Sequence, residues 1–131
     1  MAEQGNIEPG KVEPGKTALE KIDGSNWQDF VGSGVAYLML SKTDCAACNT
    51  WTSELSGFLA QTAARYEGKV RFGKMLLDQR GLTDFKRAHG EWLKDVHDLP
   101  FNVLWKGGAK AKTWPGNGVE RLTNRLDPLV A

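Results

Sequence analysis

The chain has 131 residues, of which 40% are hydrophobic, and this size and composition predict one domain with an apolar core. Its 17 basic and 16 acidic residues leave a net charge of +1, which argues against nucleic-acid binding because such binding needs a concentrated basic patch. No stretch approaches the roughly 20 apolar residues of a membrane span.

The first 16 residues differ in composition from the rest of the chain. They are rich in Gly and Pro, and they repeat Glu-Pro-Gly-Lys at 8–11 and 13–16. Because they show no apolar period, we expect a flexible leader over 1–16 and a single domain over 17–131. No apolar segment follows Met1, so we expect a cytoplasmic protein, or a periplasmic one if an export signal has been removed.

Short apolar runs alternate with helical apolar spacings along residues 17–131. The predicted elements, in chain order, are a strand at 17–22, a helix ending at Val31, a strand at 35–40, a helix at 45–66, a strand at 70–78, a helix at about 82–94 that Gly90 can split, strands at 101–105 and 111–114 joined by a turn at 106–109, and a closing helix at 119–130 whose end is disturbed by Pro128. The strand, helix and strand from 35 to 78 form a βαβ unit, so these two strands should be parallel with a right-handed crossover.

Both cysteines lie where the predicted strand at 35–40 ends and the long helix begins. Cys45 and Cys48 are separated only by Ala46 and Ala47. The first N–H groups of a helix have no intrahelical partner, and the helix dipole adds positive charge there, so a thiolate at Cys45 is stabilised. Cys48, one turn further, is placed to attack a mixed disulfide formed by Cys45. The spacing predicts a catalytic dithiol; a structural disulfide and half of a metal site are the alternatives.

The sequence contains no motif that is typical of a haem, zinc or nucleotide site. Asn49 follows the second cysteine, where a C-x-x-C-H haem motif needs histidine, and His89 and His97 do not have zinc-finger spacing from Cys48. There is no glycine-rich phosphate loop. We therefore expect neither a metal nor an organic cofactor.

The element order, with a CxxC pair opening the second helix, resembles the thioredoxin family over roughly residues 17–131. Four stretches carry the resemblance: Cys45–Cys48 at the redox motif, Lys74–Gln79 at the third strand, Leu99–Pro100 at the cis-proline, and Lys106–Gly108 with Gly116 at the final hairpin. The resemblance implies an α/β thioredoxin-like fold, a central mixed β-sheet with helices on both faces.

The resemblance also implies a substrate shelf beside the dithiol. In the family, the residue before the proline offers its backbone to the partner's extended chain, and the proline ring covers the disulfide. Leu99 and Pro100 are therefore the implied substrate-binding residues, with Asp44 and Ala46 flanking Cys45; an ordinary trans proline at a strand start is the alternative. An Asp44 carboxylate that pointed at the sulfur would oppose thiolate formation.

The sequence departs from the family at three places near the dithiol. The pair between the cysteines is Ala-Ala rather than Gly-Pro, Asp44 replaces a tryptophan, and Met39 replaces a buried acid that assists the resolving cysteine. Lys74, the partner of that acid in the family, remains, either to modulate the dithiol or as a strand lysine whose charge reaches solvent. Trp51 and Trp105 are expected to serve packing rather than substrate contact.

Together these patterns predict thiol–disulfide exchange with protein disulfides or dithiols. Cys45 is the expected nucleophile, Cys48 the resolving thiol, and another dithiol the electron donor of a monomeric enzyme. Reductase, oxidant and isomerase directions use the same residues and all remain open. The alternatives are a non-catalytic binding or chaperone module that keeps the disulfide as a staple, and a periplasmic partner of cysteine maturation.

Overall fold

The structure is a computed structural model that describes residues 19–130. The predicted leader at 1–16 and the first two residues of the predicted first strand lie outside the described residues. The elements are β2 (Leu19–Ile22), α1 (Trp27–Val31), β3 (Val35–Ser41), α2 (Ala46–Tyr66), β4 (Val70–Leu76), α3 (Thr83–Leu93), β5 (Phe101–Lys106), β6 (Ala109–Pro115) and α4 (Val119–Val130). Each element predicted from Val35 onward is present, with small shifts at its ends.

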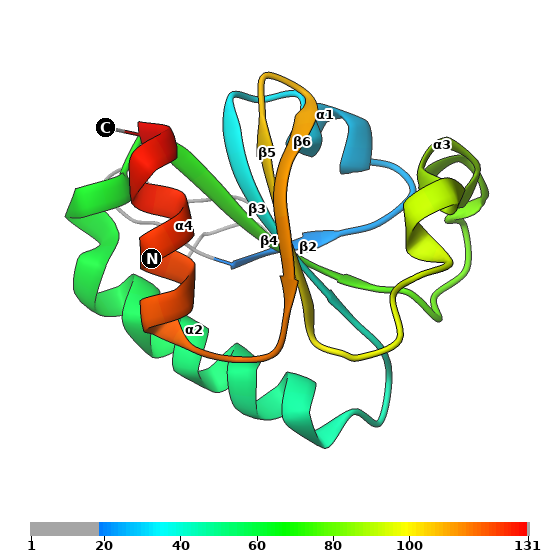
Figure 1. The fold of residues 1–131 in the computed structure, drawn as a ribbon, viewed down its shortest axis with the longest axis horizontal. Coiled ribbons are helices and arrows are strands. Elements are labelled where there is room, and N and C mark those ends of the chain that lie inside the picture. The colour runs from blue at the N-terminus through cyan, green and yellow to red at the C-terminus, as the bar shows by residue number, and fades with distance from the viewer. Residues whose placement is uncertain (1–18, 131) are drawn as a thin grey trace, which may run out of the picture.

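The strands form one mixed sheet in the order β2-β4-β3-β5-β6. Strands β2 and β3 run parallel to β4, whereas β5 is antiparallel to β3, and β6 is antiparallel to β5. The parallel pairing of β3 and β4 on either side of α2 confirms the predicted direction of these two strands. In Figure 1, α2 and α4 lie to the left of and below the strands, and α1 and α3 lie to their right, so helices cover both faces.

Alternate residues of the central strand divide the apolar interior between the two faces. Tyr37 and Met39 of β3 belong to the cluster under α2 and α4, whereas Leu38 and Leu40 belong to the cluster under α1 and α3. Because both faces are covered, every residue from Ala36 to Ser41 is buried. The two cysteines belong to the first cluster, so Met39 shares their face of the sheet.

The structure settles two points that the sequence left open and differs from the expectations in two others. Helix α3 runs unbroken through Gly90, and α4 continues past Pro128 to Val130. The β5–β6 turn is only Gly107–Gly108, both with positive φ (60° and 84°), as a tight two-residue hairpin requires. Helix α2 has an unpredicted kink at Thr62, whose hydroxyl donates to the Phe58 carbonyl at 2.7 Å and competes with the helical hydrogen bonds.

Candidate active site

A disulfide between Cys45 and Cys48 marks the start of α2, with the two Cα atoms 5.2 Å apart. Cys45 stands just before the first helical residue, Ala46, so the helix begins one residue later than predicted. Its carbonyl accepts the Asn49 N–H at 3.0 Å, and its Sγ accepts the Cys48 N–H at 3.2 Å. The sulfur thus occupies the place of a helix-capping acceptor, where an unpaired N–H and the helix dipole favour negative charge.

The two sulfur-bearing residues differ in access to solvent. Cys45 keeps 8% of its accessible surface, whereas Cys48 is fully buried. Asp44 and Ala46 on either side of Cys45 are exposed, as is Ala47. A partner molecule therefore reaches Cys45 first, and Cys48 can react only with a group already attached at Cys45.

The loop before Cys45 is held by a residue that the sequence reasoning assigned no role. The Thr43 N–H donates to both carboxylate oxygens of Asp78 at 3.1 Å, and the Thr43 hydroxyl donates to Asp78 Oδ1 at 3.3 Å. The backbone hydrogen bond lowers the pKa of Asp78 below its ordinary value. Asp78 was predicted to end a strand, but β4 stops at Leu76, and the next residues turn toward this loop.

Leu99 and Pro100 come to the same end of the sheet. Their peptide bond is cis, Pro100 is buried, and Leu99 packs against both apolar clusters, including the one that holds the cysteines. Phe101 pairs with Leu40, so this segment runs beside the end of β3 from which the chain continues to Cys45. Figure 1 shows the segment entering β5 and the β3–α2 loop at the same edge. Within residues 19–130, no group hydrogen-bonds to the backbone of Leu99.

Comparisons with known proteins identify this architecture. No protein-family model matches the sequence, and no curated protein matches it. Among solved structures, a thioredoxin of Malassezia sympodialis superimposes with a TM-score of 0.68 and 19% identity over 92% of this chain and 97% of that one. The short form of spinach chloroplast thioredoxin f gives 0.68 and 13% over 92% and 99%, and oxidized thioredoxin O2 of Arabidopsis thaliana gives 0.64 and 18% over 88% and 96%. The chain has the thioredoxin fold.

Within this thioredoxin fold, Met39 occupies the β3 position beside the dithiol. It is fully buried, and the Thr52 hydroxyl lies 3.8 Å from its sulfur while donating to the Cys48 carbonyl at 2.8 Å. Lys74 is the Cα partner of Met39 on β4. It is half-buried and lines a surface hollow at the β2 edge with Lys21 and Gln79. Its modulating role stays a prediction.

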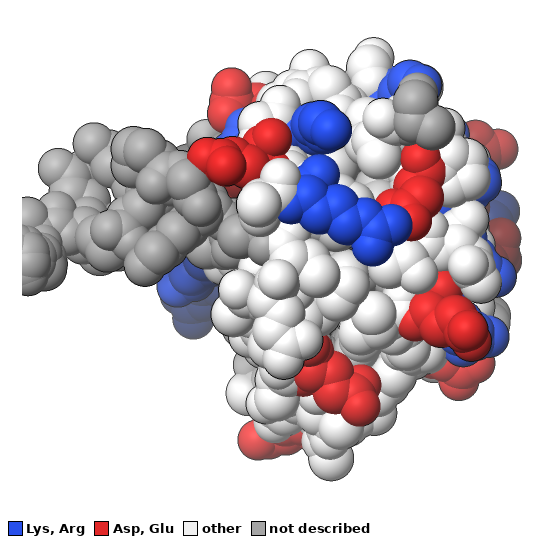
Figure 2. All heavy atoms as spheres, turned by 90° about the vertical axis from the view of Figure 1, so that its left-hand side faces the viewer, with Lys and Arg blue, Asp and Glu red and all other residues white. Residues whose placement is uncertain are grey.

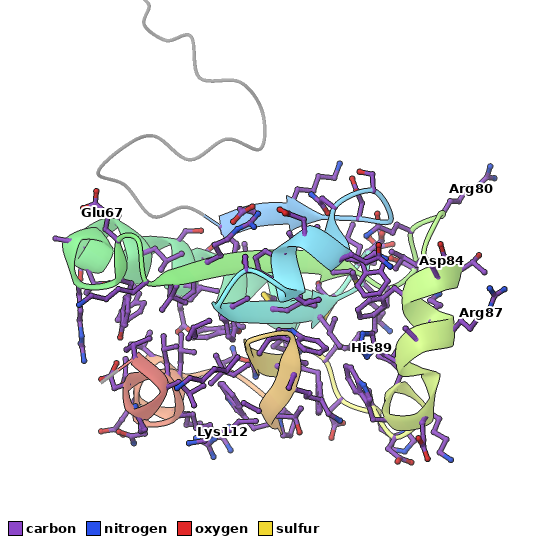
Figure 3. The ribbon with its side chains drawn as sticks, turned by 90° about the horizontal axis from the view of Figure 1, so that it is seen from above. Glu67, Arg80, Asp84, Arg87, His89 and Lys112 are labelled. Atoms are coloured by element: carbon purple, nitrogen blue, oxygen red, sulfur yellow. A yellow bond between two sulfur atoms is a disulfide. The ribbon has the colours of Figure 1, made fainter. Side chains whose placement is uncertain are left out.

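His89 lies on the face of the sheet opposite to the dithiol, among residues of the cluster under α1 and α3. His89 packs between the rings of Phe85 and Trp105, with centroids at 5.0 and 5.1 Å, and His97 is exposed. Figure 3 shows His89 pointing from α3 toward the sheet, whereas Asp84 and Arg87 point to solvent. Within residues 19–130, no three acidic, His or Cys side chains gather as a metal site would require. No helix there has the length and apolarity to cross a membrane.

Acidic and basic side chains alternate over the part of the surface formed by α2 and α4. Figure 2 shows them interspersed, without a large patch of one sign. Arg65 of α2 forms one such pair with Asp127 of α4. The charge on this face therefore does not resemble the concentrated basic surface of a nucleic-acid-binding protein.

Sequence reasoning missed one buried polar residue of the thioredoxin fold. Asn102 of β5 is fully buried next to Trp51 and Tyr37. Burial raises the pKa of Tyr37 well above its usual range, so its phenol stays protonated and donates a hydrogen bond. Trp51 and Trp105 are buried, as their predicted packing role requires. An asparagine within the apolar run Phe101–Trp105 was the available signal for a polar partner inside the core.

Proposed function

We propose that this protein is a thiol–disulfide oxidoreductase that exchanges disulfides with protein partners and is reduced again by another dithiol. The observation that carries the proposal is the asymmetry of the pair at the start of α2. Cys45 is the reachable sulfur and receives the Cys48 N–H, whereas Cys48 is enclosed behind it. This arrangement suits a nucleophile and a resolving thiol.

In the reducing direction, the reaction begins with both cysteines as thiols. The Cys45 thiolate attacks one sulfur of the partner disulfide; the partner S–S bond breaks, and its second sulfur leaves as a thiolate that takes a proton from water. Cys48 then loses its proton and attacks Cys45 Sγ, which releases the remaining partner sulfur as a thiolate. Two electrons pass to the partner, and the Cys45–Cys48 disulfide seen in the structure is the product.

Turnover of insulin by dithiothreitol tests this proposal directly. Wild type should accelerate the precipitation of reduced insulin, whereas Cys45→Ser should run at the background rate. Cys48→Ser should accumulate a mixed disulfide with insulin, visible on a non-reducing gel, because only Cys48 is placed to resolve it. Wild-type activity no higher than that of Cys45→Ser would refute the proposal.

A non-catalytic binding or chaperone module is the second candidate, and Met39 is the observation that favours it. A fully buried thioether stands where the family resemblance implies an acid that assists the resolving cysteine. If the disulfide is only a staple, glutathione should leave it oxidised and thermal stability should fall when it is reduced. Insulin turnover compared with Cys45→Ser distinguishes the candidates, and the redox equilibrium of the pair against glutathione gives the direction of exchange.

A further inference from the structure

Asn102 has all of its hydrogen-bonding capacity satisfied inside the core. Its Oδ1 accepts the Tyr37 hydroxyl and the Trp51 indole N–H, the latter at 3.2 Å. Its Nδ2 donates to the carbonyls of Trp114 and Gly116, both at 2.9 Å. The Trp51 N–H also lies 2.9 Å from the Tyr37 hydroxyl, which closes the network. A buried amide used this fully fixes the positions of every group that it contacts.

The network joins the two halves of the proposed active site. Trp51 lies one helical turn after Cys48 on α2, and it shares the apolar cluster of the two cysteines. On the other side, Gly116 receives the Asn102 amide on its carbonyl and donates its own N–H to the Pro100 carbonyl at 2.9 Å. Asn102 itself is two residues from Pro100 in the chain. A single side chain thus connects the dithiol helix to the Leu99–Pro100 segment.

Stability alone gives little reason for an amide at this place. If Asn102 and its side-chain partners were all replaced by apolar groups of similar volume, no polar side chain would have to be desolvated, and a buried network rarely exceeds such packing in stability. A polar network does restrict its neighbours to one geometry, because any displacement leaves a buried donor or acceptor unpaired. Its value here lies in the relative placement of the elements that it joins.

We propose that Asn102 is a positioning residue that holds the first turn of α2 against the Leu99–Pro100 segment. The inference rests on the proposed function: a protein substrate would lie along the free backbone of Leu99 while its disulfide meets Cys45. An extended protein chain needs Cys45 and the Leu99–Pro100 segment in a fixed relative position, whereas a small disulfide needs only Cys45. Asn102 therefore selects for protein disulfides over small ones.

The test is single-turnover reduction of two disulfides by the pre-reduced protein, insulin and the small aromatic disulfide dithionitrobenzoate. In Asn102→Leu, the half-saturating insulin concentration should rise about tenfold, the equivalent of one lost hydrogen bond, with the limiting rate little changed. The rate constant for dithionitrobenzoate should stay within about twofold, since that reaction depends on Cys45 alone. The redox equilibrium with glutathione should not move.

Two further variants keep the test decisive. Tyr37→Phe removes the phenol that donates to Asn102 and accepts from Trp51, but it leaves the direct Trp51 bond to Asn102. It should therefore give a smaller rise in the same direction even if Asn102→Leu fails to fold. Tyr66→Phe is the matched control, because it also removes one phenol hydrogen bond. Tyr66 is the last residue of α2, far from the dithiol, and its hydroxyl donates to Asp127 at 2.9 Å. Tyr66→Phe should lower stability without separating the two substrates.

The possible outcomes distinguish the positioning role of Asn102 from the oxidoreductase function on which it rests. Equal losses with insulin and dithionitrobenzoate in both Asn102→Leu and Tyr37→Phe, or an unchanged insulin dependence, would overturn the positioning role alone. A wild-type protein that reduces neither disulfide faster than Cys45→Ser would instead overturn the oxidoreductase function.

Discussion

Replacing Gly73 by alanine is expected to destabilise the domain without impairing the dithiol. Gly73 lies in β4 between its Cα partners Glu20 on β2 and Leu38 on β3. A methyl group there would come within 2.6 Å of Ile22 Cγ1 and 2.8 Å of Phe30 Cζ. Ile22 and Phe30 are fully buried in the cluster under α1 and α3, the face opposite to the cysteines.

The size of the effect follows from these two contacts. Carbon atoms prefer separations of about 3.5–4.0 Å, so both side chains must move by roughly 1 Å within a close-packed core. Overpacking of this kind costs about 1–3 kcal/mol, and the reduced freedom of the unfolded chain offsets about 0.5–1 kcal/mol. We expect a net loss of about 1–2 kcal/mol, which for a domain of this size lowers Tm by roughly 4–8 °C.

Urea and thermal denaturation followed by circular dichroism measure this change, and insulin reduction at about 25 °C measures the activity of the folded fraction. Gly57→Ala is the control, because Gly57 is an exposed residue of α2 and a methyl group there meets nothing within 4 Å. It should stabilise by about 0.5–1 kcal/mol through helix propensity. Stability of Gly73→Ala at or above that of wild type would show that the described packing around Gly73 is wrong.

Three other changes probe the periphery of the site and the opposite face. Burial lowers the pKa of His89 below its ordinary 6.5, so below about pH 6.5 the unfolded chain binds more protons than the folded one. The free energy of unfolding should therefore fall as the pH drops below about 6.5. Urea titrations of His89→Gln should show a weaker fall. Asp78→Ala should release the loop at Thr43 and slow insulin reduction about threefold. In wild type, the Thr43–Asp78 hydrogen bonds should weaken only as the pH falls through the lowered pKa of Asp78. Arg71→Met should leave the buried Glu20 without its bonds of 2.6 and 2.8 Å and destabilise by about 2 kcal/mol, with activity per folded molecule unchanged.

Exposed residues of the same types provide the controls. His97→Gln should change the free energy of unfolding little because His97 is exposed, and Asp84→Ala should not alter the exchange rate. Arg87→Met removes only an exposed contact of 3.9 Å to Asp84 and should change the free energy of unfolding little. Each prediction is contradicted if its test variant behaves like its control.

Features encoded in short stretches of sequence were predictable. The dithiol stands between an apolar run and a helical apolar spacing, and both signals lie within the 32 residues from Val35 to Tyr66. The order of elements then restricts the topology, because a parallel β3–α2–β4 crossover is almost always right-handed. The place of Cys45 and Cys48 follows from such local patterns, and the thioredoxin fold follows from the family resemblance that these patterns support.

The groups that hold the site together depend on pairings across the fold, and single-residue patterns do not reveal them. Asp78 lies 35 residues from Thr43 in sequence, and Asn102 lies 65 residues from Tyr37 and 51 from Trp51. In sequence, Asn102 is one polar residue in an apolar strand, compatible with an edge position facing solvent. Only the register that sets it opposite Met39 on β3 turns its side chain under the dithiol helix. The chemistry of this site is therefore encoded locally at the cysteines, whereas its geometry is encoded by distant polar residues that meet only after the sheet has formed.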